Sequence, residues 1–481
     1  MRFLFILFIC QLSWTQGPVQ QALNAFVTDP ANKHARISFE AVNMETGESI
    51  AAYHATHALP PASTTKLFST ASAFEILGPN HRMSTRIYCD GFIDKDSVLH
   101  GNLWIRGGGD VSLGSKFFCF ENQELSFLQA WTDSIKAKGI KFIEGAIIAD
   151  ASDFGYEGTP ASWGEGDVGN YYGAFAGGIN FYDNTVKLKF KTGANGTKAE
   201  FLGMFPDVQG FQLANFVTAA GVSSDETIVY GDAFELNRSI RGQLPSNQSS
   251  FIVKGSMPDP EFQLALEWQK VLLLNGIQVE DGAKGFRFIE KEMHGTQYDN
   301  KTMLFQVSGK SVQEIANWTN LKSVNVFADG LLLALAYQKY GKASMESALK
   351  IEMEYWKTRS STEGLIMNDG CGLSRSNAIS ATHFCSLLTY MFHSANYQNY
   401  KSTFPIAGVS GTAKYLCKGE VGEGRVFAKS GSMKGVKSYA GYIESTSGKK
   451  IAFSITVNDF SCTGNQLSVK MEKILNALAT Y

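Results

Sequence analysis

The sequence has no excess of charge of either sign, with 43 Lys and Arg residues against 45 Asp and Glu residues. A basic excess is typical of nucleic-acid-binding proteins, and an acidic run is typical of disordered tails, so neither class is favoured. We find no internal repeat and no low-complexity tract. The hydrophobic content of 44% is that of a globular protein, and 481 residues are enough for two or three domains of about 100–200 residues.

Long hydrophobic runs are also missing. The one marked apolar run extends from Phe3 to about Cys10, behind a single cation at Arg2. A membrane span needs roughly 20 apolar residues, so this run fits the core of a secretory signal better than a span. Cys10 does not suggest a lipid anchor, because Ile9 precedes it where a small residue is expected. We therefore expect residues 1–16 to be a cleaved signal peptide, with a buried N-terminal strand as the alternative, and the mature protein to be periplasmic without a membrane span.

Cysteine is scarce and scattered. Six cysteines remain after the signal segment: Cys89, Cys119, Cys371, Cys385, Cys417 and Cys462. None forms a Cys-x-x-Cys pair, and no histidine lies at a zinc-ligand spacing from them. We expect no metal and no cofactor. An exported protein could pair some of these thiols, but isolated buried thiols are the simpler interpretation.

The two ends of the chain predict one α+β domain. Residues 36–54 alternate apolar and polar side chains around a turn, which is typical of a β-hairpin. Prolines before an apolar periodic run and a glycine after it predict a helix over 62–77. Strand patterns between 425 and 458 and a helix from about 465 complete this part. Both sets of strands can join a single antiparallel sheet with helices on both faces.

The middle of the chain has a different texture. From 83 to 257, short alternating strands are separated by Gly, Asn and Asp clusters, whereas helical periodicity returns from 258 onward. The predicted organisation is therefore a domain made of 22–82 and 258–481, interrupted by a mainly-β insertion of 83–257.

Three short motifs follow one another along the chain, and each is weak alone. They are Ser63-x-x-Lys66, Ser323-Val324-Asn325 and Lys429-Ser430-Gly431. Chance matches occur as well, at Ser347-x-x-Lys350, Ser447-x-x-Lys450, Ser394-Ala395-Asn396 and Lys191-Thr192-Gly193. The predicted local structure around each match therefore has to distinguish a functional motif from a chance match.

Ser63 lies at the start of the predicted apolar helix, where a three-residue spacing puts it on the same face as Lys66. Free backbone N–H groups and partial positive charge at a helix start suit a serine nucleophile and a neighbouring oxyanion. The non-catalytic alternative is a helix cap. Ser347 is predicted mid-helix and Ser447 in a hairpin turn, and both are better interpreted as solvated.

Lys429 ends a strand pattern, so alternation puts Lys429 and Gly431 on one face and Ser430 on the other. A glycine facing a cleft would let an extended substrate approach, and Lys429 would offer a cation to a carboxylate and lower the pKa of Lys66. Ser323 and Asn325 precede an apolar helix, where helix capping is the alternative role. Lys191 runs directly into a turn and is interpreted as the end of an ordinary hairpin.

The three motifs in this order are the signature of penicillin-binding proteins and serine β-lactamases. The run Asp369-Gly-Cys-Gly-Leu-Ser-Arg375 resembles the D-G-S-G-L-S-R signature of type-4-like, class C low-molecular-mass penicillin-binding proteins, with Cys371 in place of a serine. The separation of 260 positions between Ser63 and Ser323 (323 − 63) also resembles that family, which carries an insertion there. The resemblance implies a penicillin-binding domain with an antiparallel sheet flanked by helices, and a D-Ala-D-Ala carboxypeptidase or endopeptidase.

The resemblance also implies the roles of the motif residues. Lys66 would deprotonate Ser63, whose acyl-enzyme is then hydrolysed, and Ser323 would pass a proton to the leaving amine. Asn325 would hold the substrate amide. The implied oxyanion donors are the backbone N–H groups of Ser63 and Ser432, and the D-Ala carboxylate would be held by Lys429, Ser430 and Ser432. The expected partners are peptidoglycan stem peptides, with β-lactams as covalent inhibitors.

A stretch from Trp163 to Ala174 resembles the family's subsite for the amino group of the third stem residue. Its acidic member is Asp167 or Glu165, and its expected neighbours are Tyr171, Arg375 and Met433. The alternative is a solvated loop with packed aromatic residues.

Two rival functions share the signature. A class A serine β-lactamase needs a glutamate four residues before an asparagine between the second and third motifs, and none stands between Asn325 and Lys429. A non-catalytic wall-binding protein would not need the complete set of motif side chains. The sequence leaves open the balance between carboxypeptidase and endopeptidase, the third stem residue and the oligomeric state.

Overall fold

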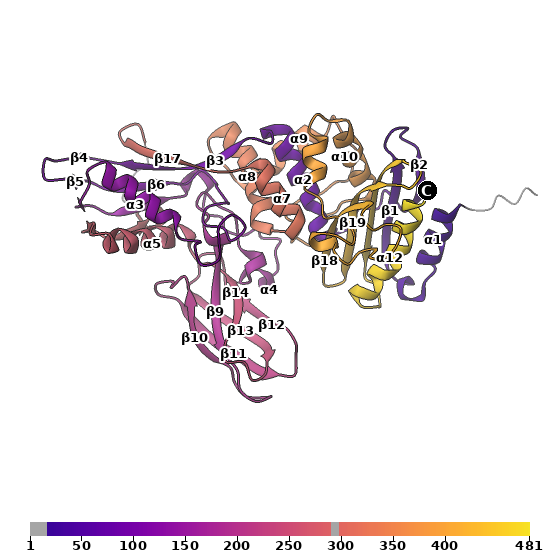
Figure 1. The fold of residues 1–481 in the computed structure, drawn as a ribbon, viewed down its shortest axis with the longest axis horizontal. Coiled ribbons are helices and arrows are strands. Elements are labelled where there is room, and N and C mark those ends of the chain that lie inside the picture. The colour runs from indigo at the N-terminus through magenta and orange to yellow at the C-terminus, as the bar shows by residue number, and fades with distance from the viewer. Residues whose placement is uncertain (1–16, 290–297) are drawn as a thin grey trace, which may run out of the picture.

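The computed structural model describes residues 17–289 and 298–481. The predicted signal segment 1–16 lies outside the described residues. At one end of the molecule stands a five-stranded antiparallel sheet (Figure 1). Its strands, in spatial order, are β18 (Val426–Met433), β19 (Val436–Glu444), β20 (Lys450–Asn458), β1 (Arg36–Asn43) and β2 (Ser49–Tyr53). The N-terminal hairpin and the C-terminal strands thus share one sheet, which confirms the prediction.

Helices cover both faces of this sheet. On one face, α1 (Pro18–Val27) and α12 (Gly464–Ala479) bury apolar side chains against Phe39 and Phe453 of the strands. On the other face, α10 (Ala381–His393) packs against β1 and β20. Since both faces are covered, all but the first residue of β20 are buried, including the polar Ser454, Thr456 and Asn458.

The predicted helix over 62–77 is present as three consecutive helical segments. A tight 3₁₀ turn (Ala62–Thr65) leads into α2 (Lys66–Ser72) and then into a wider π-helical turn (Ala73–Leu77). Every residue of α2 is buried, which explains its mixture of small and apolar side chains. α2 is covered by α7 (Val312–Lys322), α8 (Asn325–Tyr340) and α9 (Met345–Trp356).

After residue 77 the chain leaves this domain through β3 (Arg82–Cys89) and returns through β17 (Thr302–Ser311), which pairs with β3. The two strands belong to a second five-stranded sheet. Its remaining strands are β6 (Leu103–Arg106), β8 (Ile147–Asp150) and β16 (Ala283–Gly285), beside a small sheet of β4 (Phe92–Ile93), β5 (Val98–His100), β7 (Phe142–Ile143) and β15 (Gln278–Val279).

Helix α5 (Pro260–Leu274) lies with the insertion. It packs on β8 and β16 and beside α3 (Phe127–Ala137), where the rings of Trp131 and Trp268 meet edge to face at 5.1 Å. The return to the first domain therefore follows Ser311 rather than the expected residue 258. The helical periodicity of 258–274 was interpreted as the start of the returning domain. It belongs instead to α5, a helix inside the insertion.

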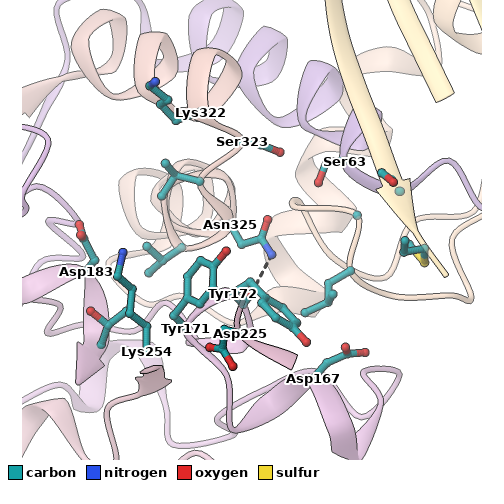
Figure 2. A pocket seen from close by; sticks show the side chains of 18 of the residues that line it. Ser63, Asp167, Tyr171, Tyr172, Asp183, Asp225, Lys254, Lys322, Ser323 and Asn325 are labelled. Carbon is teal, nitrogen blue, oxygen red and sulfur yellow. Dashed lines mark hydrogen bonds between the residues drawn. The ribbon is translucent and has the colours of Figure 1, made fainter. Parts of the chain in front are cut away.

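The second part of the insertion is wholly β and hangs below the rest of the molecule in Figure 1. One three-stranded sheet consists of β10 (Glu200–Phe205), β9 (Thr185–Lys191) and β14 (Phe251–Ser256). The other consists of β11 (Gln212–Ala220), β13 (Asn237–Pro245) and β12 (Glu226–Tyr230). The short α4 (Glu165–Val168) packs against β12, and the segment around it brings Asp167, Tyr171 and Tyr172 to the side of the cavity facing Ser63 (Figure 2).

The position of α5 makes a testable prediction. Trp268 is fully buried in the core of the insertion, whereas Leu274 on the same helix is 86% exposed. We expect Trp268→Ala to lower the free energy of unfolding of the insertion by about 3–5 kcal/mol, because it leaves a cavity. The matched control Leu274→Ala should change it by less than about 0.5 kcal/mol. Urea denaturation followed by circular dichroism measures both, and equal effects would contradict this placement of α5.

Candidate active site

Ser63 and Lys66 lie on one turn at the start of the buried helix. The Lys66 Nζ is 3.0 Å from the Ser63 Oγ, as expected for two side chains three residues apart. The same amine is 2.6 Å from the Asn325 Oδ1 and 2.6 Å from the Cys371 backbone oxygen. Three separate chain segments thus meet at one buried lysine.

Lys429 of β18 approaches the same place from the sheet. It is buried, and its Nζ donates hydrogen bonds to the Ser323 Oγ at 2.9 Å and to the Ser430 backbone oxygen at 2.7 Å. Ser323 is the single residue between α7 and the N-cap of α8, and it has left-handed backbone angles (φ 61°, ψ 41°). This turn directs its hydroxyl toward Ser63 (Figure 2). The structure therefore brings all three motifs together.

Gly431 was expected to let a substrate approach the strand, but the structure gives the glycine a packing role. A Cβ atom there would lie 2.4 Å from the Pro61 backbone oxygen and 2.2 Å from the Ser438 Oγ. The space beside the glycine is thus filled by the turn that carries Ser63 rather than left open to a substrate. The missing side chain lets β18 pack directly against that turn.

Burial governs the ionisation of the two lysines. Burial lowers the pKa of Lys66 below its ordinary value, although Cys371, Asp329 and Asp369 act in the opposite direction. The pKa of Lys429 is held well below its ordinary value by burial and by repulsion from Lys66. Burial is therefore the main cause at Lys66, and the repulsion between the two lysines acts on the pKa of Lys429. Two buried amines in one cleft favour the state with at least one neutral amine.

Two buried carboxyl groups lie behind Lys66. Asp369 accepts four N–H hydrogen bonds, from the Trp163 Nε1, the Asn377 Nδ2, and the backbone nitrogens of Gly372 and Ser374, and a fifth from the Cys371 thiol. Asp329 of α8 accepts one from the Gly370 nitrogen, at 2.8 Å, and its Oδ2 has no partner in the part of the chain that the structure describes. Burial, together with the charge of Asp369, raises the pKa of Asp329 to about 7.

A cavity of about 790 Å³ opens in front of Ser63. Eight of the residues predicted from the sequence line it: Ser63, Ser323, Asn325, Ser432, Met433, Arg375, Asp167 and Tyr171. Lys66, Lys429 and Gly431 are buried behind this lining. Ser430 is not part of the lining, since its hydroxyl is bonded to the Thr412 Oγ1 at 2.8 Å.

The insertion contributes the wall of the cavity opposite Ser63 (Figure 2). Asp167 lines the cavity and Glu165 does not, which distinguishes the two acidic candidates. Burial and the neighbouring Asp167, to which its hydroxyl is hydrogen-bonded, raise the pKa of Tyr172 to about 12. The Tyr172 backbone oxygen accepts a hydrogen bond from the Asn325 Nδ2 at 2.7 Å.

The chance matches to the motifs lie elsewhere and have structural roles. Ser347 completes the cap of α9, and the Ser447 hydroxyl is bonded to the backbone of Tyr481. Ser394 and Asn396 hold the Glu75 carboxylate. The hydroxyl of Thr192, in the Lys-Thr-Gly match, bonds the Pro245 oxygen in the insertion.

Sequence reasoning missed Asp329 and the cavity lysines Lys116, Lys254 and Lys322. A single aspartate inside the apolar run of α8 was a visible signal for Asp329, since such a residue is rarely buried without a partner. The lysines come from three distant segments and carry no local signal. All six cysteines are free thiols, and the described ranges contain no group of three acidic, His or Cys side chains placed to hold a metal.

A comparison with known protein families decides the assignment. The family described as D-Ala-D-Ala carboxypeptidase 3 (S13) matches residues 19–480. The chain belongs to this family. Membership confirms the predicted class of enzyme, a serine D,D-peptidase of the type-4-like penicillin-binding proteins.

Individual members of the family are similar over most of their length. A D-alanyl-D-alanine carboxypeptidase of Actinomadura sp. is 25% identical over 458 residues, which cover 92% of this chain and 81% of the relative. The D-alanyl-D-alanine carboxypeptidase DacB of Haemophilus influenzae is 25% identical over 452 residues, covering 90% and 88%.

Solved structures show the same fold. Penicillin binding protein 4 (dacB) from Haemophilus influenzae has a TM-score of 0.79 at 24% identity, covering 96% of this chain and 99% of that chain. The same protein complexed with a novel β-lactam gives a TM-score of 0.74 at 21% identity, covering 97% and 100%. The predicted α+β penicillin-binding fold is thereby confirmed.

The buried carboxyl behind Lys66 yields a prediction for this peptidase. The charge of Asp329 raises the pKa of Lys66, so Asp329→Asn should lower it and increase the neutral fraction at a given pH. We expect the rising limb of the acylation rate against pH to shift to lower pH. The effect should appear above about pH 7, since Asp329 is largely protonated below that value.

Glu352 provides the matched control. It is also fully buried, its pKa is also raised to about 7 by burial, and it bonds Ser72 rather than facing Lys66. Glu352→Gln should leave the pH midpoint of acylation unchanged. Stopped-flow acylation by a chromogenic β-lactam measures both variants, and an unchanged or higher midpoint for Asp329→Asn would contradict the prediction.

Proposed function

We propose that the enzyme cleaves D-alanyl-D-alanine termini or D-alanyl cross-links of peptidoglycan stem peptides through an acyl-enzyme on Ser63. The observation that carries this proposal is the 3.0 Å contact between the Lys66 Nζ and the Ser63 Oγ at the edge of the large cavity. Serine is a weak nucleophile without a base, and a lysine with a lowered pKa is a suitable base.

In the acylation step, Lys66 takes the proton from Ser63 as its oxygen attacks the carbonyl carbon of the D-alanyl residue. The negative oxygen of the tetrahedral intermediate is stabilised by the backbone N–H groups of Ser63 and Ser432. Support for this pair comes from Gly431, whose close packing holds the strand that carries Ser432 against the turn of Ser63.

The leaving amine needs a proton. Ser323 is the proposed relay: its hydroxyl gives a proton to the amine and regains one from Lys66, which took it from Ser63. Its hydroxyl lines the cavity and is held by Lys429 at 2.9 Å. The Asn325 amide holds Lys66 through its oxygen and orients it toward Ser63. Water then hydrolyses the ester of Ser63, which releases the shortened peptide and restores the free serine.

The terminal carboxylate of the substrate is assigned to Ser432 at the cavity edge, to the Lys429 amine behind it, and to Ser430, whose hydroxyl would exchange its bond with Thr412. β-Lactams carry a comparable amide and carboxylate, and we propose that they acylate Ser63. The amino group of the third stem residue is assigned to Asp167 beside Tyr171, with Arg375 and Met433 as neighbours.

We also propose export to the periplasm, where stem peptides are found. The support is the apolar run that follows Arg2 in the first residues of the chain. None of the described helices combines the length and apolar character that crossing a membrane requires.

Substitution of Ser63 tests the proposal. Ser63→Ala should abolish labelling by a fluorescent penicillin and lower the release of D-Ala from a pentapeptide by at least about 10⁴-fold, because the nucleophile is lost. The matched control is Ser447→Ala, which alters another Ser-x-x-Lys match in a surface turn and should retain full labelling.

Mass analysis of digested muropeptides identifies the bond that is cut. Normal labelling of Ser63→Ala would show that another residue is the nucleophile. Rapid turnover of penicillin by the wild type, without a lasting adduct, would instead indicate a β-lactamase.

A further inference from the structure

The cavity extends well beyond Ser63 into a region with a different charge. Two neighbouring lysines line this region, Lys116 before α3 and Lys254 on β14, and Lys322 at the end of α7 lines the cavity elsewhere. Lys254 lies beyond Tyr171, on the side away from Asp167 (Figure 2). The cavity thus has an acidic side around Asp167 and a separate basic side.

The basic side has more positive charge than the neighbouring carboxylates offset. Lys116 is paired with Asp183 at 2.7 Å. Neither Lys254 nor Lys322 forms an ion pair within the described ranges. Burial and the charges of Lys116 and Lys187 lower the pKa of Lys254, and Asp183 offsets them in part. A cationic group in this position gains a partner when an anion enters.

The register of the sheet holds Lys254 in place. Alternation along β14 puts Ile252 and Lys254 on the side that lines the cavity and Val253 in the core. The Lys254 Nζ lies 6.0 Å from the centre of the Tyr171 ring, so the amine is bordered by this ring on one side. The amine is therefore presented to the cavity by a paired strand rather than by a mobile loop.

We propose that Lys254, with Lys116, forms a carboxylate-binding subsite for an acidic residue of the substrate peptide, upstream of the residue whose amino group faces Asp167. The inference rests on the proposed function, in which the scissile D-alanyl end lies at Ser63. The rest of the peptide must then leave through the remainder of the cavity, along this basic wall. The enzyme accordingly prefers stem peptides whose upstream acidic residue carries a free carboxylate over peptides in which that group is amidated.

Two synthetic pentapeptides test the subsite on the full-length enzyme. They end in the same D-Ala-D-Ala and differ in one group, a free carboxylate or a carboxamide on the upstream acidic residue. We expect kcat/KM for D-Ala release to be about tenfold higher for the acid in the wild type, the effect of one charge-assisted contact. Lys254→Gln should remove most of this preference, because the acid peptide then loses its charged partner.

Lys191→Gln is the matched control, because Lys191 is an exposed lysine of the same sheet that does not line the cavity. It should keep the tenfold preference. Acylation by a small β-lactam, which lacks the upstream residues, should be normal in both variants and reports correct folding.

The outcomes separate the two proposals. Equal rates on the two peptides in the wild type, or an equal loss of preference in Lys191→Gln, would overturn the subsite while leaving the peptidase function intact. A wild type that releases D-Ala from neither peptide would overturn the proposed function itself.

Discussion

Lys66 is fully buried, and its amine lies among the oxygens of Ser63, Asn325 and Cys371. Burial disfavours the charged form of an amine, and an unpartnered buried polar group is costly. The surrounding oxygens satisfy the amine without forming a direct ion pair with it. They come from the start of α2, the start of α8 and the segment after Asp369. The packing of these three elements is therefore set by the requirements of one side chain.

Asp369 extends this arrangement outward. Its carboxylate accepts hydrogen bonds from four N–H groups, three in the 372–377 segment and one on Trp163 of the insertion. Carboxylates that accept several N–H bonds hold a loop in one conformation without needing a cation. The Cys371 carbonyl is positioned by this loop, so the hydrogen-bonding network around Asp369 contributes to the placement of Lys66.

The sequence predicted the parts of the structure that follow from local pattern. Three features were predicted: the sheet built from both ends of the chain, the buried helix after Ser63 and the three motifs. Each follows from the order and spacing of residues in the sequence. The match of Lys191-Thr192-Gly193 was separated from Lys429 by the turn that follows it and by its position before Ser323-Val324-Asn325 in the chain.

Features that depend on the packing of distant chain segments were not predicted from the sequence. The end of the insertion was predicted too early, because α5 has the same periodicity wherever it packs. Gly431 was assigned to substrate access, although its true neighbour is Pro61, which is distant in the sequence. Burial of Lys66 depends on α8 and the 369–375 segment, and no spacing within a motif reports it. The basic wall of the cavity combines residues of two segments and had no sequence pattern.

The hydrogen bond between Asn325 and Tyr172 connects the insertion to the chemistry. A side-chain amide has one accepting and one donating end, and the two ends are nearly equal in shape. Because the Tyr172 carbonyl takes the donating end, the accepting end must turn toward Lys66. Without the inserted segment, the amide could rotate and present its NH₂ group to the lysine, which needs an acceptor there. The insertion thus fixes the orientation of the Asn325 amide. It is therefore a structural part of the active site.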